Sequence, residues 1–323
     1  MPTLALLAPF GLAATVFADR HFDRMRATGV LVDARFGESA SEVMDRLGAV
    51  DCIVSTWGMP AVNDAFLAAA PRLRGIFYAA GSVKGFCTPA LWARDITVSS
   101  AAPANAVPVA EYTVGVILLS HKHFWRFMGK GYDEPRVVPG NYRRTVGLIG
   151  ASLVGRETIR LLAGYDLNVL LYDPFVSAEE ATRLGVTKVE LPELMATSDV
   201  VSLHAPNLPH LHYMINADLL ARMKDGALFI NTARGALVDE AALLTELQTG
   251  RITAVLDVTD PEPPVPDSPF WTLPNVIYTP HIAGSMCQEC QRMADFALDE
   301  LDRFLTGEPL RYPVTEAMLA RMA

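Results

Sequence analysis

The sequence predicts an α/β protein of two domains, each built on a doubly wound parallel sheet, and three observations support this. The chain has 323 residues, of which 51% are hydrophobic and 20% charged, enough for two globular cores. Short apolar segments alternate with amphipathic ones through the first hundred residues, as they do when helices connect parallel strands. A strand, a glycine turn, a helix and a second strand follow one another over residues 144–174.

The first hundred residues contain five candidate strands and four candidate helices. The apolar N-terminal stretch has no preceding Lys or Arg and is interrupted by Pro9 and Gly11. We therefore expect a buried strand followed by a turn there, and no signal peptide. We also expect no membrane helix, because no apolar run reaches the ~18 residues that one needs. The strands are expected at residues 4–8, 29–33, 52–56, 75–79 and 96–99, and the helices at 18–28, 39–47, 61–70 and 88–93.

The unit over residues 144–174 has the pattern of a dinucleotide-binding site. A strand over 146–149 leads into the turn from Gly150 to Gly155, and the helix after it ends near residue 163. Gly150 allows the sharp turn, Gly155 lets helix and strand pack closely, and the helix N-terminus offers N–H groups to a pyrophosphate. Asp173 follows the strand over 168–172, 18 residues after Gly155. An acid about 20 residues on accepts hydrogen bonds from ribose hydroxyls.

This motif departs from G-x-G-x-x-G at its middle position, where Ser152 replaces glycine. Because the backbone comes closest to the pyrophosphate there, the serine either donates its hydroxyl to a phosphate oxygen or crowds it. Two other interpretations of the motif stay open: an ordinary strand–turn–helix that binds nothing, and the glycine turn of a methyltransferase.

Charge and cysteine content exclude several classes of partner. A net charge of −9 without any Lys/Arg run argues against a nucleic-acid partner and an anionic membrane surface. Four scattered cysteines give no disulfide framework, and we predict a cytoplasmic protein. Cys287 and Cys290 form a C-x-x-C in a predicted helix without a second ligand pair, and His121 and His123 do not share a helix face. We therefore predict no metal site.

The second half of the chain places three polar residues just beyond predicted strand ends: Arg234, Glu262 and His281. In a parallel sheet such positions share one edge, here the edge of the Gly150 turn. Each alone could be a surface charge, a loop acid or a structural histidine. Strands are expected at 200–203, 227–231, 252–256 and 275–279, and helices at 107–125, 177–184, 191–197, 217–223, 239–248 and 285–306; residues 129–142, rich in glycine and proline, are expected to form a loop.

Two loops of the first half also follow strand ends, at residues 55–60 and 80–84. Gly81, Ser82 and Val83 could form a nest of backbone N–H groups for a carboxylate, and Trp57 lies in the other loop. Taken alone, each loop is better explained as an ordinary turn without a ligand.

Several segments together resemble the D-isomer-specific 2-hydroxyacid dehydrogenases, in the right order and over essentially the whole chain. They are residues 150–156, 230–235, 256–263 and 279–285, supported by 109–111 and 200–206. The resemblance implies a flavodoxin-like substrate domain over 1–104 plus 287–323 and a Rossmann NAD-binding domain over 105–286. The helix over 107–125 would bridge the domains and help to bury a subunit contact, and we expect a homodimer.

The resemblance also implies roles for the polar residues. Arg234 matches the residue that binds the substrate carboxylate and polarises its 2-oxo group, His281 the proton donor or acceptor, and Glu262 the acid paired with it. Gly81, Ser82 and Val83 match the loop that cradles the carboxylate. The cofactor-contacting positions are Gly150, Ser152, Leu153, Val154, Gly155, Asp173, Thr232, Ala233, Arg234, Asp257, His281 and Gly284.

We expect NAD(H) rather than NADP(H), because Asp173 is followed by Pro-Phe-Val and not by a basic residue that could bind a 2′-phosphate. Trp57 falls near the position where relatives acting on phosphorylated substrates have an arginine, and no regulatory domain follows Ala323. We therefore expect a small unphosphorylated acid such as hydroxypyruvate or glyoxylate. The alternative is an NAD-sensing protein, as in corepressors of the same fold; the absence of an added recruitment segment disfavours it.

Overall fold

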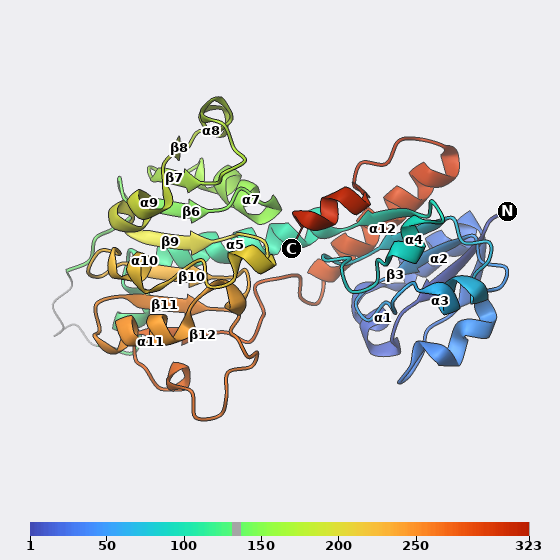
Figure 1. The fold of residues 1–323 in the computed structure, drawn as a ribbon, viewed down its shortest axis with the longest axis horizontal. Helices are drawn as coiled ribbons and strands as arrows, with labels where there is room; N and C mark the ends of the chain where they lie inside the picture. The colour runs from blue at the N-terminus through green and yellow to red at the C-terminus, as the bar shows by residue number, and fades with distance from the viewer. Residues whose placement is uncertain (131–136, 323) are drawn as a thin grey trace. The chain divides into compact units, whose positions relative to one another are not determined.

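The computed structural model describes residues 1–130 and 137–322, so residues 131–136 of the predicted loop over 129–142 lie outside the described part. The chain divides into two compact units, Met1–Asn105 with Ser285–Met322, and Ala106–Gly284. Each unit has its own largely parallel sheet with helices packed against it (Figure 1). The predicted fold class, two doubly wound α/β domains, is confirmed.

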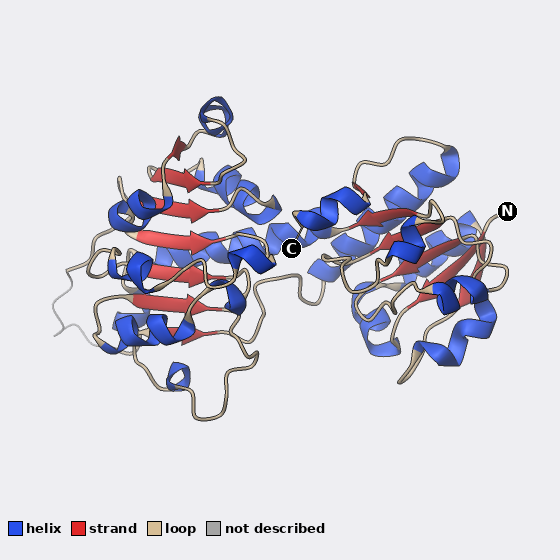
Figure 2. Cartoon of the chain, in the orientation of Figure 1, coloured by secondary structure: helices blue, strands red, loops and turns tan. Residues whose placement is uncertain are grey.

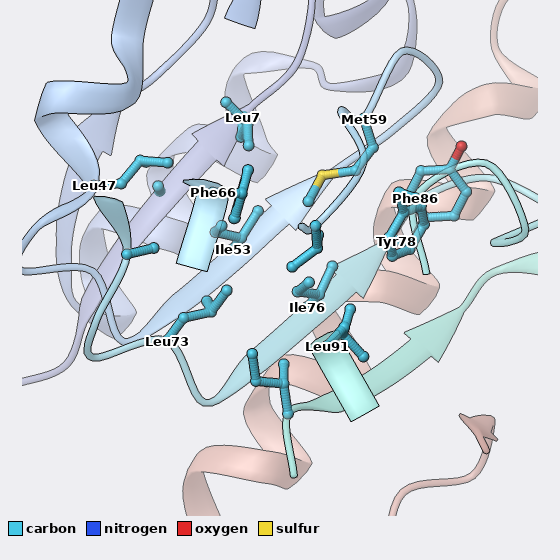
Figure 3. Packing of buried hydrophobic residues seen from close by; sticks show 14 of the residues in the cluster. Leu7, Leu47, Ile53, Met59, Phe66, Leu73, Ile76, Tyr78, Phe86 and Leu91 are labelled. Carbon is cyan, nitrogen blue, oxygen red and sulfur yellow. The ribbon is translucent and has the colours of Figure 1, made fainter. Parts of the chain in front are cut away.

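The first unit contains a six-stranded sheet in the order β13-β5-β4-β3-β1-β2, parallel except for β13, which pairs antiparallel with β5. The central strand β3 is buried on both faces, because its alternate residues enter different cores: Ile53 packs in one with Phe66 and Leu91 (Figure 3), and Val54 packs in the other with Leu298. The strands are β1 Thr3–Leu7, β2 Val30–Asp33, β3 Cys52–Ser55, β4 Gly75–Tyr78, β5 Thr97–Ser100 and β13 Pro313–Val314; the helices are α1 Phe10–Val16, α2 Asp19–Thr28, α3 Asp64–Ala69, α4 Pro89–Trp92 and α12 Glu289–Thr306, with 3-10 helices at Ala40–Leu47 and Glu316–Ala320.

The second unit contains a seven-stranded parallel sheet in the order β12-β11-β10-β9-β6-β7-β8. Figure 2 shows its strands in red, with helices in blue packed against them. The strand order reverses at β6, and ligands of doubly wound sheets bind beyond the carboxyl ends of the strands at such a point. The strands are β6 Thr145–Ile149, β7 Asn168–Tyr172, β8 Thr187–Lys188, β9 Val200–Leu203, β10 Leu228–Asn231, β11 Thr253–Leu256 and β12 Val276–Tyr278; the helices are α5 Ala102–Ser120, α6 Phe124–Phe127, α7 Leu153–Leu162, α8 Ala178–Leu184, α9 Leu191–Thr197, α10 Ala217–Ala221 and α11 Glu240–Gln248, with 3-10 helices at Pro209–Leu211, Gly235–Leu237 and Pro269–Trp271.

One helix is missing from the predictions, and the predicted starts of two others are wrong. A helix, α1, follows Pro9 directly where we expected a turn, because proline is well tolerated at a helix start. Helix α5 begins before residue 107 and includes Pro108, whose missing N–H removes only one helical bond. Asn105 therefore lies inside the helix, and its Oδ1 accepts the Ser285 N–H at 3.0 Å. Helix α12 begins only at Glu289, so Cys287 precedes the helix that contains Cys290.

The expectation that no apolar run is long enough to cross a membrane is also wrong. By length and composition α5 meets that criterion, with 19 residues and a mean hydropathy of 1.3. Half of this window is buried within the structure, where Val114, Val116 and Ile117 pack in one core with Leu148. The core helix of a globular domain has this packing, and the prediction that the protein contacts no membrane stays a prediction.

Candidate active site

The turn after β6 requires glycine at two positions. Gly150 has φ +98°, and a Cβ atom there would lie 2.9 Å from backbone atoms of His204 and Ala205. A Cβ atom on Gly155 would overlap the carbonyl oxygen of Gly150. The turn therefore leads directly into α7, with its first amide groups presented at the carboxyl edge of the sheet.

Ser152 is the N-cap of α7, and its Oγ accepts the Gly155 N–H at 3.3 Å. Accepting this hydrogen bond uses a lone pair of the Ser152 oxygen, so the hydroxyl hydrogen can still be donated to another group. The N–H groups of Leu153 and Val154 lie in the first turn, where a helix provides no carbonyl partner. The geometry therefore favours the prediction that Ser152 donates to a phosphate oxygen.

The carboxylate of Asp173 lies against this turn. Its Oδ2 accepts the Ala151 N–H at 2.7 Å, and its Oδ1 accepts the Phe175 N–H at 2.8 Å. Arg156 braces the same turn, since its Nε donates to the Ala151 carbonyl at 2.9 Å and its Nη2 to Glu180 at 2.7 Å. Arg156 was not among the predicted site residues, although its place directly after the last glycine is a signal that could have indicated it.

A second turn, after β10, carries Thr232, Ala233 and Arg234. Asn231 shapes it, because its Oδ1 accepts the Ala233 N–H and its Nδ2 donates to the Arg234 carbonyl, both at 3.0 Å. The Thr232 hydroxyl oxygen is buried and has no hydrogen-bond partner among the described residues. A buried hydroxyl without a partner is costly unless a ligand satisfies it, so the turn fits a bound cofactor. Asn231, also missed, could have been found as a buried amide at a strand end.

The structure brings Glu262 and His281 together. The Nδ1 atom of His281 lies 2.6 Å from Oε1 of Glu262, and both side chains are partly exposed. An ionised carboxylate only accepts hydrogen bonds, so Nδ1 carries the hydrogen in this pair. The other ring nitrogen, Nε2, is then the atom that can exchange a proton with a substrate.

The loop of His281 is held by the buried carboxylate of Asp257. Its Oδ1 accepts the Ile282 N–H at 2.9 Å and its Oδ2 the Ala283 N–H at 3.0 Å. The Asp257 carbonyl also accepts the N–H of His281, which has φ +53°. Asp257 therefore fixes an uncommon backbone conformation at His281, and its predicted contact with the cofactor stays a prediction.

A hydroxyl chain extends this network to α5. Thr279 donates its hydroxyl to Asp257 Oδ1 at 2.7 Å, and Tyr112 lies 2.8 Å from the same threonine oxygen. Since the single hydroxyl hydrogen of Thr279 is used on the carboxylate, Tyr112 is the donor to Thr279. Burial is the main cause that raises the pKa of Tyr112, so this hydroxyl stays protonated as a donor should.

Arg234 lies beyond the end of β10, the strand next to β11, after which Asp257 follows, and its side chain is not bonded to the histidine pair. Its Nη1 donates to the Ala233 carbonyl at 2.6 Å, and no hydrogen bond joins it to Glu262 or His281 within residues 1–130 and 137–322. The backbones of the two turns nevertheless touch, because a Cβ atom on Gly235 would overlap the Thr259–Asp260 peptide. Arg234, Glu262 and His281 thus follow three neighbouring strands, β10, β11 and β12.

The predicted substrate-binding residues Gly81, Ser82, Val83 and Trp57 lie in the first unit, beyond the ends of β4 and β3. Ser100 holds their loop, because its Oγ donates to the Gly81 carbonyl at 2.6 Å. Val83 is fully buried, and Trp57 packs partly buried against both cores of the unit. Their participation in one site with Arg234 stays a prediction.

Glu240, which was not predicted, accepts the Asp260 N–H on its Oε1 at 2.8 Å. Burial raises the pKa of this carboxyl to about 7. A raised pKa means that the folded state binds a proton more tightly than the unfolded state, so stability contributed by this group falls as pH rises from about 4.5 through 7.

We therefore expect the Glu240→Gln variant to lose less stability between pH 5 and pH 8 than the wild type. The measurement is the free energy of unfolding from urea titrations at several pH values across this range. Glu193→Gln, at an exposed position in the first turn of α9, is the control and should follow the wild type. If the free energy of unfolding depends on pH in the same way for wild type and Glu240→Gln, the pKa of Glu240 is not raised by folding.

The fold and the two ligand-directed turns define a dinucleotide-binding α/β protein. The family model of the D-isomer specific 2-hydroxyacid dehydrogenase NAD-binding domain matches residues 121–283. The chain is 30% identical to a glyoxylate reductase of Korarchaeum cryptofilum, over 84% of each chain. The chain therefore belongs to the D-isomer specific 2-hydroxyacid dehydrogenase family, and both the predicted family and the predicted NAD cofactor are confirmed.

Two further relatives extend the similarity. A D-3-phosphoglycerate dehydrogenase of Archaeoglobus fulgidus is 32% identical over 94% of this chain and 58% of its own length. The chain thus spans roughly half the length of the phosphoglycerate dehydrogenases that it matches. The crystal structure of a D-lactate dehydrogenase from Treponema pallidum superimposes with a TM-score of 0.77 and 25% identity, covering 98% of this chain and all of the other.

Proposed function

We propose that this protein transfers a hydride between NAD(H) and C2 of a small D-2-hydroxy acid or 2-oxo acid. The observation that carries the proposal is the hydrogen bond between His281 and Glu262 at 2.6 Å, on the same sheet edge as the glycine turn. A histidine oriented by a carboxylate is suited to general acid–base catalysis near neutral pH.

The proposed roles follow from the side-chain chemistry. In the reducing direction, Nε2 of His281 donates a proton to the 2-oxo oxygen, and Glu262 holds the ring through Nδ1 and stabilises the imidazolium. Arg234 binds the substrate carboxylate with its planar fork and polarises the 2-oxo group, which orients C2. NAD(H), when bound, supplies or accepts the hydride.

Most of the groups that would hold the cofactor have no other hydrogen-bond partner among the described residues, whereas Asp173 already accepts two backbone N–H groups and would use a remaining lone pair. The first-turn amides of α7 and the hydroxyl hydrogen of Ser152 suit the pyrophosphate, and the orphaned hydroxyl of Thr232 suits a polar group of the cofactor. Asp173 suits the adenosine ribose. Of the other predicted positions, Ala233 lies in the turn of Thr232, and Gly284 lies in the loop of His281 after β12.

We expect the KM for NADH to be at least about tenfold below that for NADPH. The Asp173 carboxylate lies against the glycine turn, where it would repel a 2′-phosphate. Initial-rate measurements with both cofactors test this expectation. Asp173→Ser should reduce the ratio of the KM for NADPH to the KM for NADH. Asp166→Ser, which changes an acid outside the glycine turn, is the control and should leave this ratio unchanged. A lower KM for NADPH in the wild type would show the cofactor preference to be wrong.

For the substrate, we propose hydroxypyruvate or glyoxylate. The glyoxylate reductase relative, 30% identical over 84% of each chain, supports this proposal. The test is NADH oxidation with a panel of 2-oxo acids that includes glyoxylate, hydroxypyruvate, pyruvate and phosphohydroxypyruvate. Tight NADH binding without turnover on any of them would favour the NAD-sensing alternative.

We further propose a cytoplasmic homodimer that buries the apolar face near the end of α5. Leu119, Phe124 and Met128 are large, hydrophobic and exposed along α5, α6 and the following turn. Single exposed apolar residues are common, whereas contiguous exposed apolar patches mark interaction sites, and we propose that these three residues form such a patch. Light scattering after size exclusion measures the mass.

A further inference from the structure

We propose that Glu240 is a positioning residue that fixes the loop from which Glu262 reaches His281. This inference rests on the proposed function, in which the Glu262–His281 pair moves the proton. Glu240 is the first residue of α11 and lies 20 positions before Asp260, whose N–H it accepts.

The carboxylate of Glu240 is not needed to cap its own helix. Asp239 is the N-cap of α11, and its Oδ1 accepts the Ala242 N–H at 3.0 Å. The side chain of Glu240 instead leaves the helix and accepts the Asp260 N–H on Oε1 at 2.8 Å. A carboxyl oxygen accepts an N–H in both the neutral and the ionised form, so this contact holds the Asp260 peptide whether or not Glu240 carries its proton.

The sequence of the loop makes this one hydrogen bond important. Residues 260–264 are Asp-Pro-Glu-Pro-Pro, so only Asp260 and Glu262 have a backbone N–H. The N–H of Asp260 is therefore the last backbone donor before Glu262. If Glu240 did not accept this N–H, no backbone N–H group in residues 260 and 261 would be hydrogen-bonded, and the loop just before Glu262 would lose this anchor.

Two further contacts set the path of the loop on either side of Asp260. The Thr259 hydroxyl donates to the Pro261 carbonyl at 2.8 Å. Gly235 packs so closely on the Thr259–Asp260 peptide that any side chain at 235 would overlap it. Glu240 thus holds the peptide from the side of α11, while the turn that follows Arg234 supports it from β10.

The test compares Glu240→Ala, which removes the acceptor, with Glu240→Gln, which keeps an acceptor oxygen and removes the charge. Three quantities are measured on the full chain: amide hydrogen exchange at Asp260, the 15N signal of His281 Nδ1–H, and kcat and KM for NADH and glyoxylate. Glu193→Ala, in the exposed first turn of α9, is the matched control. Glu240→Asp, which shortens the side chain by one methylene, replaces the alanine variant if that variant does not fold.

For Glu240→Ala we expect amide hydrogen exchange at Asp260 to be at least tenfold faster and the His281 Nδ1–H signal to be shifted or lost. We also expect kcat to be about tenfold lower, while the KM for NADH stays within twofold of the wild-type value. Glu240→Gln should restore all three toward wild type, and Glu193→Ala should change none of them. A general structural defect would instead raise the KM for NADH as well and would not be rescued by glutamine.

The proposal is overturned if Glu240→Ala leaves either the Asp260 exchange or the His281 signal as in the wild type, or if glutamine and alanine lower kcat equally. The experiment distinguishes an error in the role proposed for Glu240 from an error in the proposed function. If the wild type turns over no 2-oxo acid, the function is wrong, whereas the exchange and 15N measurements still decide whether Glu240 holds the loop.

Discussion

Replacing His281 with alanine should lower kcat for 2-oxo acid reduction by about 10²- to 10⁴-fold, the usual contribution of a positioned general acid. The physical reason is that Nε2 is the proton donor, while Nδ1 is occupied by Glu262 at 2.6 Å. NADH binding should remain within about twofold, because the phosphate-directed turn at Gly150 is unchanged. Steady-state kinetics and NADH fluorescence titration measure the two effects.

Glu262→Gln tests the other half of the pair, since glutamine keeps an acceptor oxygen for Nδ1 but no longer stabilises a positive imidazolium. We expect it to lower kcat less than His281→Ala does. His210→Ala, an exposed histidine at a different loop, is the control and should be fully active. Undiminished turnover in His281→Ala would show that another group donates the proton.

Arg234→Gln should lower kcat/KM for the oxo acid by about 10²- to 10³-fold, which is about 3–4 kcal/mol of transition-state stabilisation. The loss should appear in both kcat and KM, because the guanidinium is proposed to bind the carboxylate and to polarise the 2-oxo group. It should be smaller for a substrate analogue without a carboxylate, which the wild type already binds poorly. Steady-state kinetics on both substrates provide the measurement.

The Arg234→Lys variant distinguishes the contribution of the positive charge of Arg234 from that of its planar guanidinium group. Lysine keeps the charge but not the planar fork, so it should recover only part of the lost activity. Arg222→Gln, at an exposed position at the end of α10, is the matched control. Equal losses on substrates with and without a carboxylate would contradict the role assigned to Arg234.

The sheet of the second unit could be predicted from the sequence because its strands are short apolar runs bounded by glycine or polar residues. The strands β7 and β9 have the expected bounds, and the helix after the glycine turn ends one residue from the expected position. The starts of α1 and α5 could not be predicted in the same way. Proline is compatible with the first turn of a helix and with a loop, and only the packing around α1 and α5 decides between them.

The loops that carry Glu262 and His281 could be placed on one sheet edge because each residue follows a strand of a parallel sheet. The position of a residue after a strand does not show which contacts hold its loop in place. The contacts of Asp257 with Ala283, of Glu240 with Asp260 and of Arg156 with Glu180 join residues 20 to 26 positions apart through the direction of single side chains. That direction depends on the folded backbone, so the supporting contacts of these residues could be seen only in the structure.

The most direct test of the central claim is the fate of deuterium from NADH labelled at the transferable C4 position of the nicotinamide. We expect the purified protein to convert glyoxylate or hydroxypyruvate to the hydroxy acid with one deuterium at C2, and hydroxypyruvate to give the D-isomer. A product without deuterium at C2, the L-isomer, or bound NADH that is not oxidised by any 2-oxo acid would contradict the proposed reaction.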